Sequence, residues 1–133
     1  MDIEMKNQYD QIPEKLNDLS NKIIGCAFTV SNTLGAGFLE KVYENAFAIE
    51  LRNVNLHVEQ QFPLKVLYHG IVVGDYFVDL LVENEILIEI KTINAITEVH
   101  QAQCINYLKA TGYRLCPLIN FARPKIEIKR IVL

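Results

Sequence analysis

Apolar residues recur at steps of three and four between residues 14 and 34, which is the spacing of one face of an α-helix. This pattern predicts a helix from about Glu14 to Leu34, and the Gly-Ala-Gly segment at residues 35–37 predicts its end. A second helix is expected from Phe38 to about Asn53, with Glu40 in its first turn. The side of this helix that is predicted to face the core holds Leu39, Val42, Tyr43, Ala46 and Phe47.

From Leu56 onward the chain is rich in β-branched and aromatic residues separated by Gly and Pro, which is typical of strands. A helix is expected from Thr97 to Thr111, capped by Thr97 and ended by Gly112. The segments RLCPLINF (114–121) and KIEIKRIVL (125–133) predict two final strands. The earlier predicted strands lie at residues 57–61, 64–68, 71–81 and 86–91.

This order of elements predicts a mixed sheet flanked by helices, in an α/β or α+β fold. With 133 residues, half of them hydrophobic, the chain is long enough for a single domain with a real core. We expect one domain over residues 1–133, with a polar tail at residues 1–12. The polar start and the short apolar runs argue against a signal peptide and a membrane helix. The three cysteines are odd in number, far apart in sequence and without metal-ligand spacing, so reduced and mostly buried thiols in a cytoplasmic protein are predicted: Cys26, Cys104 and Cys116.

Charge is distributed unevenly along the chain. Residues 1–108 contain seven Lys and Arg against fifteen Asp and Glu, whereas residues 109–133 contain six against one. This asymmetry fits an acidic site beside a basic rim that holds an anionic polymer, and it fits equally well a chance excess of solvated basic side chains. The basic residues that could follow a phosphate backbone are Arg114, Arg123, Lys125, Lys129 and Arg130.

The segment VDLLVENEILIEIK, residues 78–91, places three ionisable residues inside apolar strands. If residues 83–85 form the turn, the register of the hairpin places Asp79 opposite Glu89. Because side chains alternate along a strand, Asp79, Glu89 and Lys91 share one face. Two opposed carboxylates with Cβ atoms about 5 Å apart repel each other, so the pairing needs a compensating charge. The opposite face is wholly apolar and is predicted to be core, with Val78, Leu80, Val82, Ile86, Ile88 and Ile90.

A divalent cation would compensate the repulsion, because Mg²⁺ and Mn²⁺ prefer hard oxygen ligands held close together. Lys91, two residues beyond Glu89 on the same face, would add a mobile positive charge beside such a metal. The alternative is a solvated strand face on which Glu89 and Lys91 form an ordinary ion pair. The spacing of these residues alone leaves both interpretations open.

The arrangement of Asp79, Glu89 and Lys91 resembles the signature of the PD-(D/E)XK nuclease superfamily, although Val78 stands where that name has Pro. The resemblance runs from about residue 19 to residue 133. It implies a restriction-endonuclease-like core with Mg²⁺ or Mn²⁺ as the cofactor. The implied metal ligands are the side chains of Asp79, Glu89 and Glu40 and the main-chain carbonyl of Ile90. Lys91 would then assist phosphodiester cleavage.

Two further motifs support the resemblance. GFLEKVY, residues 37–43, is similar to the motif that names the GxxExxY family, a set of small bacterial and archaeal proteins of this superfamily. Within this motif, Gly37 is expected to help the chain enter the helix, and Tyr43 is expected to lie in the core. QCINY, residues 103–107, fits the QxxxY motif of the lambda-exonuclease-like branch. By that resemblance Gln103 would orient Lys91 or a phosphate, and Tyr107 would line the same cleft.

These features predict a metal-dependent nuclease that acts on nucleic acid, with DNA as the expected substrate. A homodimer is an expected arrangement, because related nucleases often pair to cut duplexes. His100, three residues before Gln103, could contact substrate or metal, but a lone His on a helix is more often a surface or packing residue. The alternative function is a non-catalytic module that retains the nuclease fold to bind nucleic acid or a partner protein. A purely structural interaction protein would have no metal affinity.

Overall fold

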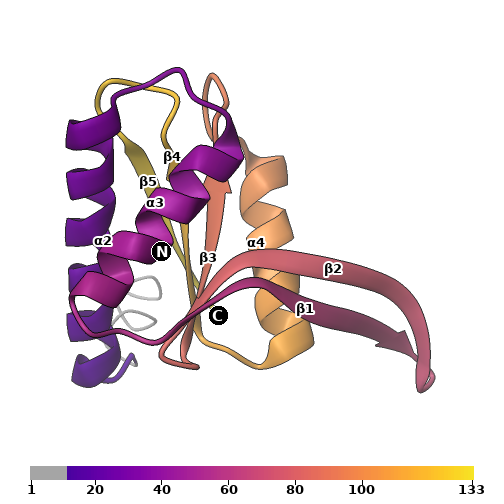
Figure 1. The fold of residues 1–133 in the computed structure, drawn as a ribbon. Helices are drawn as coiled ribbons and strands as arrows, with labels where there is room; N and C mark the ends of the chain where they lie inside the picture. The colour runs from indigo at the N-terminus through magenta and orange to yellow at the C-terminus, as the bar shows by residue number, and fades with distance from the viewer. Residues whose placement is uncertain (1–11) are drawn as a thin grey trace, which may run out of the picture.

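The computed structural model describes residues 12–133, which form three helices and five strands in the predicted order (Figure 1). The helices are α2 (Glu14–Leu34), α3 (Glu40–Asn53) and α4 (Glu98–Thr111). The strands are β1 (Val58–Tyr68), β2 (Ile71–Val82), β3 (Ile86–Lys91), β4 (Leu115–Asn120) and β5 (Glu127–Val132). The predicted N-terminal tail lies outside the described residues apart from Ile12, which is buried.

The strands form one mixed sheet in the order β1-β2-β3-β4-β5. Within the described chain, β3 and β4 run parallel and the other neighbouring pairs are antiparallel. The parallel pair requires a long return connection, which α4 provides. In Figure 1, α2 and α3 cover one face of the sheet and α4 covers the other. The predicted mixed sheet flanked by helices is confirmed.

Two hydrophobic clusters hold the helices against the sheet. The cluster under α2 and α3 includes Ile23, Phe47, Leu80 and Ile88. The cluster under α4 includes Leu81, Leu87, Cys104 and Leu108. Because β3 lies between the two clusters, every residue from Ile86 to Ile90 is buried. The face of the hairpin that carries Glu89 is therefore also part of the interior, whereas the sequence predicted core only on the opposite face.

β1 is one continuous strand, where the sequence predicted two strands with a break after residue 61. Gln61 has a φ of 54°, in the left-handed region that side-chain-bearing residues adopt rarely. The register pairs Gln60 with Leu80 and Phe62 with Val78, which places Gln61 beside Asp79. The predicted break is thus a local irregularity inside a long hairpin.

The alternation of side chains changes by one position at this irregularity. In β2, Leu80 packs in the cluster under α2 and α3, whereas Val78 packs in the cluster under α4. In β1, Val58 and Leu64 are divided between the two clusters in the same way. The prediction that Val78 shares the apolar face of Leu80 is therefore wrong, because the left-handed residue interrupts the regular pleat.

α3 buries a different stripe from the one predicted. Leu39 is its N-cap residue and is 80% exposed, and Val42 is exposed as well. The ring of Tyr43 stacks on that of Phe121 with 4.8 Å between centroids, and its hydroxyl donates a hydrogen bond to the Gly35 carbonyl at 2.6 Å. These contacts fix the rotation of α3 about its axis, so that the carboxylate of Glu44 faces inward together with the apolar residues. The buried residues are Tyr43, Glu44, Phe47, Ala48 and Leu51.

The other helices match their predictions. α2 spans the predicted residues. α4 follows Thr97, whose main-chain N–H donates to Nδ1 of His100 at 3.0 Å, and it ends at Gly112 with a φ of 84°. All three cysteines are free and buried, as predicted. Between residues 12 and 133, no helix combines the length and apolarity needed to cross a membrane.

Candidate active site

β2 separates from β3 at Asp79, and this opening in the sheet is where the predicted site residues meet. The two strands pair in the predicted register, which ends with Leu80 opposite Ile88. Beyond that pair, main-chain N–H groups of the two strands donate to carboxylate side chains instead of to main-chain carbonyls. The N–H of Ile90 donates to Oδ2 of Asp79 at 2.7 Å, and the N–H of Asp79 donates to Oε1 of Glu89 at 3.2 Å. Each carboxylate thus satisfies a main-chain donor that the opening would otherwise leave unpaired.

Both carboxyl groups lie where their charged form is disfavoured. Glu89 is 4% exposed, and burial, followed by the charge of Asp79, raises its pKa to about 8. Burial also raises the pKa of Asp79, although hydrogen bonds from Ile90 and Gln61 oppose the shift. The interpretation of Glu89 as part of a solvated strand face is wrong, because α4 covers that face. Two close acids that resist ionisation are typical of functional sites.

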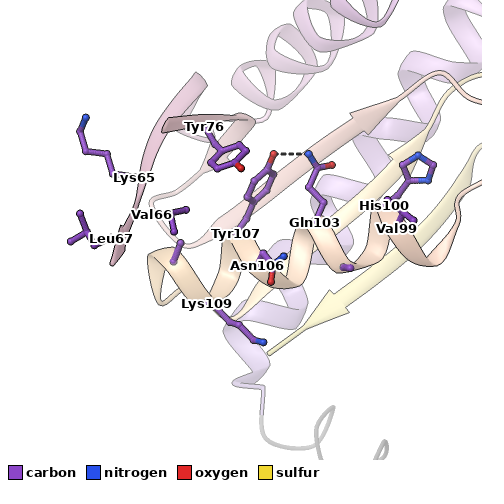
Figure 2. Close-up of a pocket in the computed structure, with 12 residues that line it drawn as sticks. Lys65, Val66, Leu67, Tyr76, Val99, His100, Gln103, Asn106, Tyr107 and Lys109 are labelled. Carbon is purple, nitrogen blue, oxygen red and sulfur yellow. Dashed lines mark hydrogen bonds between the residues drawn. The ribbon is translucent and has the colours of Figure 1, made fainter. Parts of the chain in front are cut away.

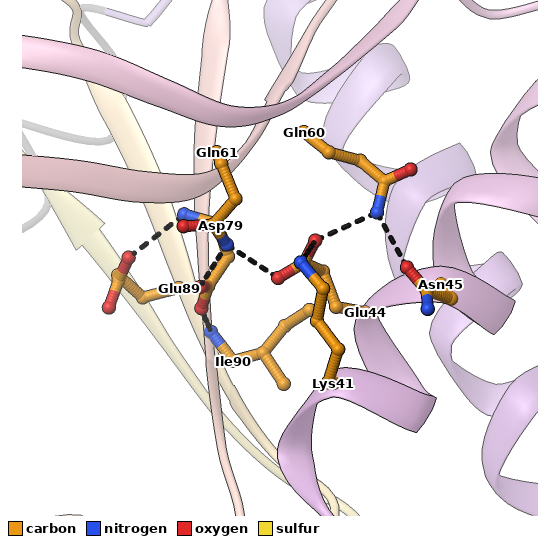
Figure 3. Close-up of polar contacts among 8 residues, drawn as sticks. All are labelled: Lys41, Glu44, Asn45, Gln60, Gln61, Asp79, Glu89 and Ile90. Carbon is orange, nitrogen blue, oxygen red and sulfur yellow. Dashed lines mark hydrogen bonds and ion pairs between the residues drawn. The ribbon is translucent and has the colours of Figure 1, made fainter.

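A buried carboxylate on α3 reaches the same opening (Figure 3). Glu44 is 3% exposed and accepts hydrogen bonds from Gln60 at 2.7 Å and from Gln61 at 2.6 Å. The same amide nitrogen of Gln61 lies 3.3 Å from Oδ1 of Asp79, so one side chain links the two acids. Lys41 adds an ion pair to Glu44 at 2.9 Å. The left-handed conformation of Gln61 therefore lies at a point where α3, β1 and β2 share a polar network.

Glu40 and Lys91 lie at the edge of the opening. Partial desolvation, followed by the charge of Asp79, raises the pKa of Glu40, while Lys91 opposes this shift. The ammonium of Lys91 lies 3.8 Å from Oε2 of Glu89, and its side chain is 19% exposed. The structure therefore brings four of the predicted site residues into one electrostatic group, with Lys91 as its positive member.

The carboxylates do not form a ready-made metal cage. Among residues 12–133, no group of three or more His, Cys, Asp or Glu side chains is arranged to hold a metal ion. One oxygen of Asp79 and one oxygen of Glu89 accept hydrogen bonds from main-chain N–H groups in this arrangement. Ile90, whose carbonyl was the fourth expected ligand, donates its N–H to Asp79. The chemistry of the donor set still fits a hard divalent cation, which would relieve the repulsion between carboxylates.

α4 approaches the opening from the other face and forms a groove with the β1–β2 hairpin (Figure 2). The groove has a volume of about 960 Å³. The amide of Gln103 donates to the hydroxyl of Tyr107 at 2.8 Å, and the ring of Tyr107 lies 5.9 Å from that of Tyr76 across the groove. Burial, followed by the charge of Glu89, raises the pKa of Tyr107. His100 also lines the groove, but its Nδ1 is engaged in capping the helix.

The loop after Lys91 is held by a buried Asn at the end of β4. Oδ1 of Asn120 accepts the N–H of Ile93 at 3.1 Å, and its Nδ2 donates to the carbonyl of the same residue at 2.8 Å. Glu127 on β5 accepts the N–H of Ile96 at 3.0 Å. These bonds connect the strand that ends in Lys91 to the start of α4, and so they position both sides of the site.

Three polar residues of this site, Glu44, Gln61 and Asn120, were missed by reasoning from the sequence. A signal existed for two of them. Glu44 lies four residues after Glu40, on the stripe that α3 buries, and Asn120 stands in the otherwise apolar run of β4. A polar residue in such a run is informative, because an interior position tolerates it only with hydrogen-bond partners.

The basic residues expected to form one rim are divided, and two of them lie at the site end of the sheet. Arg123 donates to the carbonyl of Asn94, in the loop after Lys91, at 2.9 Å. Lys125 is exposed in the same connection between β4 and β5. Both are therefore near the strand end that carries Lys91.

The other three basic residues lie elsewhere. Arg114 precedes β4 at the opposite end of the sheet, where it donates to the carbonyl of Leu133 at 2.8 Å. Arg130 donates to the side chain of Asn17 on α2. Lys129 is exposed on the edge strand β5. The structure does not gather the five residues into a single surface.

The chain is similar to a known protein family and to known structures. A model of the PD-(D/E)XK nuclease superfamily matches residues 17–131. Among solved structures, the crystal structure of SSO0001 is similar, with a TM-score of 0.53 and 20% sequence identity, over 70% of this chain and 50% of that chain. This chain thus spans half the length of SSO0001, and the likeness concerns the fold alone. A search of curated proteins found no match.

Proposed function

Because the chain belongs to the PD-(D/E)XK nuclease superfamily, we propose that it is a metal-dependent nuclease that hydrolyses phosphodiester bonds of DNA. The observation that supports this most is the pair of close carboxylates at the opening of the sheet, the half-buried Asp79 and the buried Glu89, with Lys91 beside them. A purely structural role would not explain two mutually repelling acids in an interior position, where an apolar pair would be more stable.

The side chains of Asp79, Glu89 and Glu40 and the carbonyl of Ile90 are the groups that would hold Mg²⁺ or Mn²⁺. When bound, such an ion would polarise the phosphodiester and lower the pKa of an attacking water. Lys91 would orient that water and stabilise negative charge that develops on the phosphate in the transition state. Its limited exposure and its proximity to Glu89 keep the ammonium close to the reacting groups.

The groove between α4 and the hairpin would hold the nucleic acid. Tyr76 and Tyr107 offer aromatic faces on which bases stack, while Lys109 on its lining attracts phosphates. The hydrogen bond between Gln103 and Tyr107 fits a paired role for the QxxxY motif and supports a place in the lambda-exonuclease-like branch. The motif at residues 37–43 supports the further proposal that the chain is a member of the GxxExxY family.

Cleavage assays test this function directly. The purified protein would be incubated with labelled single- and double-stranded DNA and RNA, in the presence of Mg²⁺, Mn²⁺ or EDTA. We expect cleavage of DNA that EDTA abolishes and that Asp79→Asn removes. Asp75→Asn on the outer part of the same strand is the matched control and should retain activity. Binding of DNA without cleavage in any metal would instead support the non-catalytic binding module.

Metal binding is tested separately by thermal unfolding. A divalent ion that relieves carboxylate repulsion binds the folded chain and raises its Tm. We expect Mn²⁺ and Mg²⁺ to raise the Tm of the wild type and of Asp75→Asn, and to do so much less for Asp79→Asn. Equal shifts in all three proteins would place the ion at another site.

A further inference from the structure

The outer part of the β1–β2 hairpin extends beyond the rest of the sheet (Figure 1). β3 pairs with β2 only at residues 80–82, so the segment from Ile71 to Phe77 has β1 as its sole strand partner within the described chain. An isolated two-stranded ribbon is at best marginally stable in water. The groove-facing side of the ribbon rests near α4, but its other side has no covering element among residues 12–133.

This uncovered side is strongly apolar. Figure 2 shows Val66 pointing toward α4, while Leu67 points away from it. Four large apolar side chains on this side of the ribbon are between 44% and 61% exposed. We refer to them as the outer ribbon face: Leu67, Val72, Val73 and Phe77.

The size of the outer ribbon face is close to what a protein interface requires. If a large apolar side chain has a full accessible area of roughly 200 Å², four of them at this exposure present roughly 450 Å². The largest apolar patch of an ordinary monomer is about 300–600 Å². A specific interface buries roughly 600–1,000 Å² on each partner, of which about 57% is apolar, so the outer ribbon face matches the apolar part of one half of such an interface.

The charge of the ribbon indicates which class of partner fits the outer ribbon face. Its charged residues are Lys65 and Asp75, which form an ion pair with 2.9 Å between Nζ and Oδ1. The ribbon is therefore close to neutral, and it lacks the excess of positive charge that a nucleic-acid surface needs. Two copies of the same ribbon would not repel each other, and a two-fold axis would bring the Lys65 of one copy toward the Asp75 of the other, which is the self-complementarity of an isologous contact.

We propose that the outer ribbon face is a homodimer interface, in which it packs against the same face of a second copy of this chain about a two-fold axis. The dimer covers the apolar side chains of both hairpins and stabilises ribbons that are marginal alone. The proposal concerns association only and holds whether or not the protein cleaves DNA.

Sedimentation velocity of the full chain over a range of concentrations tests the proposal. The test variant is Val72→Lys with Phe77→Lys, and the matched control is Ile49→Lys, which replaces an equally exposed apolar residue on α3 (57% against 59% for Phe77). We expect a dimer for the wild type and for the control. Because two lysines per copy would meet their counterparts across the interface, the Kd of the test variant should rise by about 100-fold or more.

Circular dichroism should show the same folded state in all these proteins, because the substituted side chains are exposed. An uncharged double variant, Val72→Thr with Phe77→Ser, guards against disruption of the fold by charge and should weaken dimerisation by about tenfold. A monomeric wild type at roughly 100 µM would overturn the proposal and would leave the face to a different partner. Folded double variants that dimerise as tightly as the wild type would overturn it as well.

Discussion

The inner half of β2, residues 78–82, and its outer half, residues 71–77, are both rich in apolar residues, but their surroundings are very different. In the inner half, Val78 and Leu80 are completely buried, because α3 and α4 cover opposite faces of the sheet there. In the outer half, Val73 and Phe77 are 61% and 59% exposed. The layer of α2 and α3 covers the first half and stops before the second, so the same kind of residue lies in the core in one place and on an open surface in the other.

The boundary between these halves coincides with the candidate site. Asp79 lies where pairing with β3 ends, and its carboxylate accepts a main-chain N–H that the missing strand pair would otherwise have bonded. An opening in a sheet is a costly feature, because it exposes donors and admits acids into the interior. The candidate site thus lies at the boundary between a packed half and an unpaired half of the strand, and each prediction below tests one side of that division.

The largest expected effect is on catalysis. Lys91→Ala should lower the rate of DNA cleavage by about 10²–10⁴-fold, because it removes a group that acts on the water or on charge developing in the transition state. DNA binding should weaken only modestly, since one phosphate contact among several is lost. Cleavage rate and Kd would be measured at fixed salt and Mg²⁺. Lys22→Ala, on the exposed side of α2, is the control, and undiminished cleavage by Lys91→Ala would show that the activity arises elsewhere.

The next effect concerns the pH dependence of stability without metal. The pKa of Glu89 in the folded chain, about 8, exceeds its ordinary value of 4.5, so the folded state binds more protons than the unfolded state between these values. The free energy of unfolding should therefore fall as pH rises through this window, by roughly 3 kcal/mol for this group. Urea unfolding at pH 5.5 and 8.5 measures the fall.

Glu89→Gln should remove most of that dependence and be more stable than the wild type at the higher pH. Glu59→Gln is the control, because Glu59 is an exposed carboxylate on β1. A wild type whose stability is the same at both pH values would contradict the assignment of a protonated acid to the interior.

The two halves of β2 can be compared with one substitution. Val78→Ala should lower the free energy of unfolding by about 2 kcal/mol, because it leaves a cavity in the cluster under α4. Val73→Ala should change it by less than about 0.5 kcal/mol when measured at a concentration at which the chain is monomeric. Equal effects at the two positions would mean that the outer ribbon is covered within the monomer.

The smallest effect distinguishes two neighbouring glutamines. Gln60 and Gln61 both donate to Glu44, but only Gln61 also reaches Asp79. Each change to Ala should lower stability by about 1 kcal/mol, because a buried carboxylate loses a donor. Gln61→Ala alone should also weaken Mn²⁺ binding several-fold, by releasing Asp79. Isothermal titration would measure this, and equal weakening by Gln60→Ala would exclude a positioning role for Gln61.

Much of this fold follows from local patterns. The bounds of α2 and α4, the caps at Thr97 and Gly112, and the register of the β2–β3 hairpin were all predicted. Such features depend on contacts between residues a few positions apart, so the spacing of apolar and turn residues is enough to specify them. The same register identified Asp79, Glu89 and Lys91 as neighbours.

Features that failed prediction depend on contacts between distant segments. The rotation of α3 is set by the stacking of Tyr43 on Phe121, which lie 78 positions apart in the chain, and this rotation is what buries Glu44 and exposes Val42. The change of faces at Gln61, the division of the basic residues between both ends of the sheet, and the exposure of the outer ribbon have the same origin.

The sequence by itself therefore determined the helices, the register of the β2–β3 hairpin and three residues of the candidate site, Asp79, Glu89 and Lys91. The tertiary structure decided which other polar groups join them, Glu44 and Gln61 from one side and Gln103 and Tyr107 from the other. The physical reason lies in the range of the interactions. Alternation and helical periodicity act over a few residues, whereas the burial that raises the pKa of Glu89 requires two helices to close over the same strand.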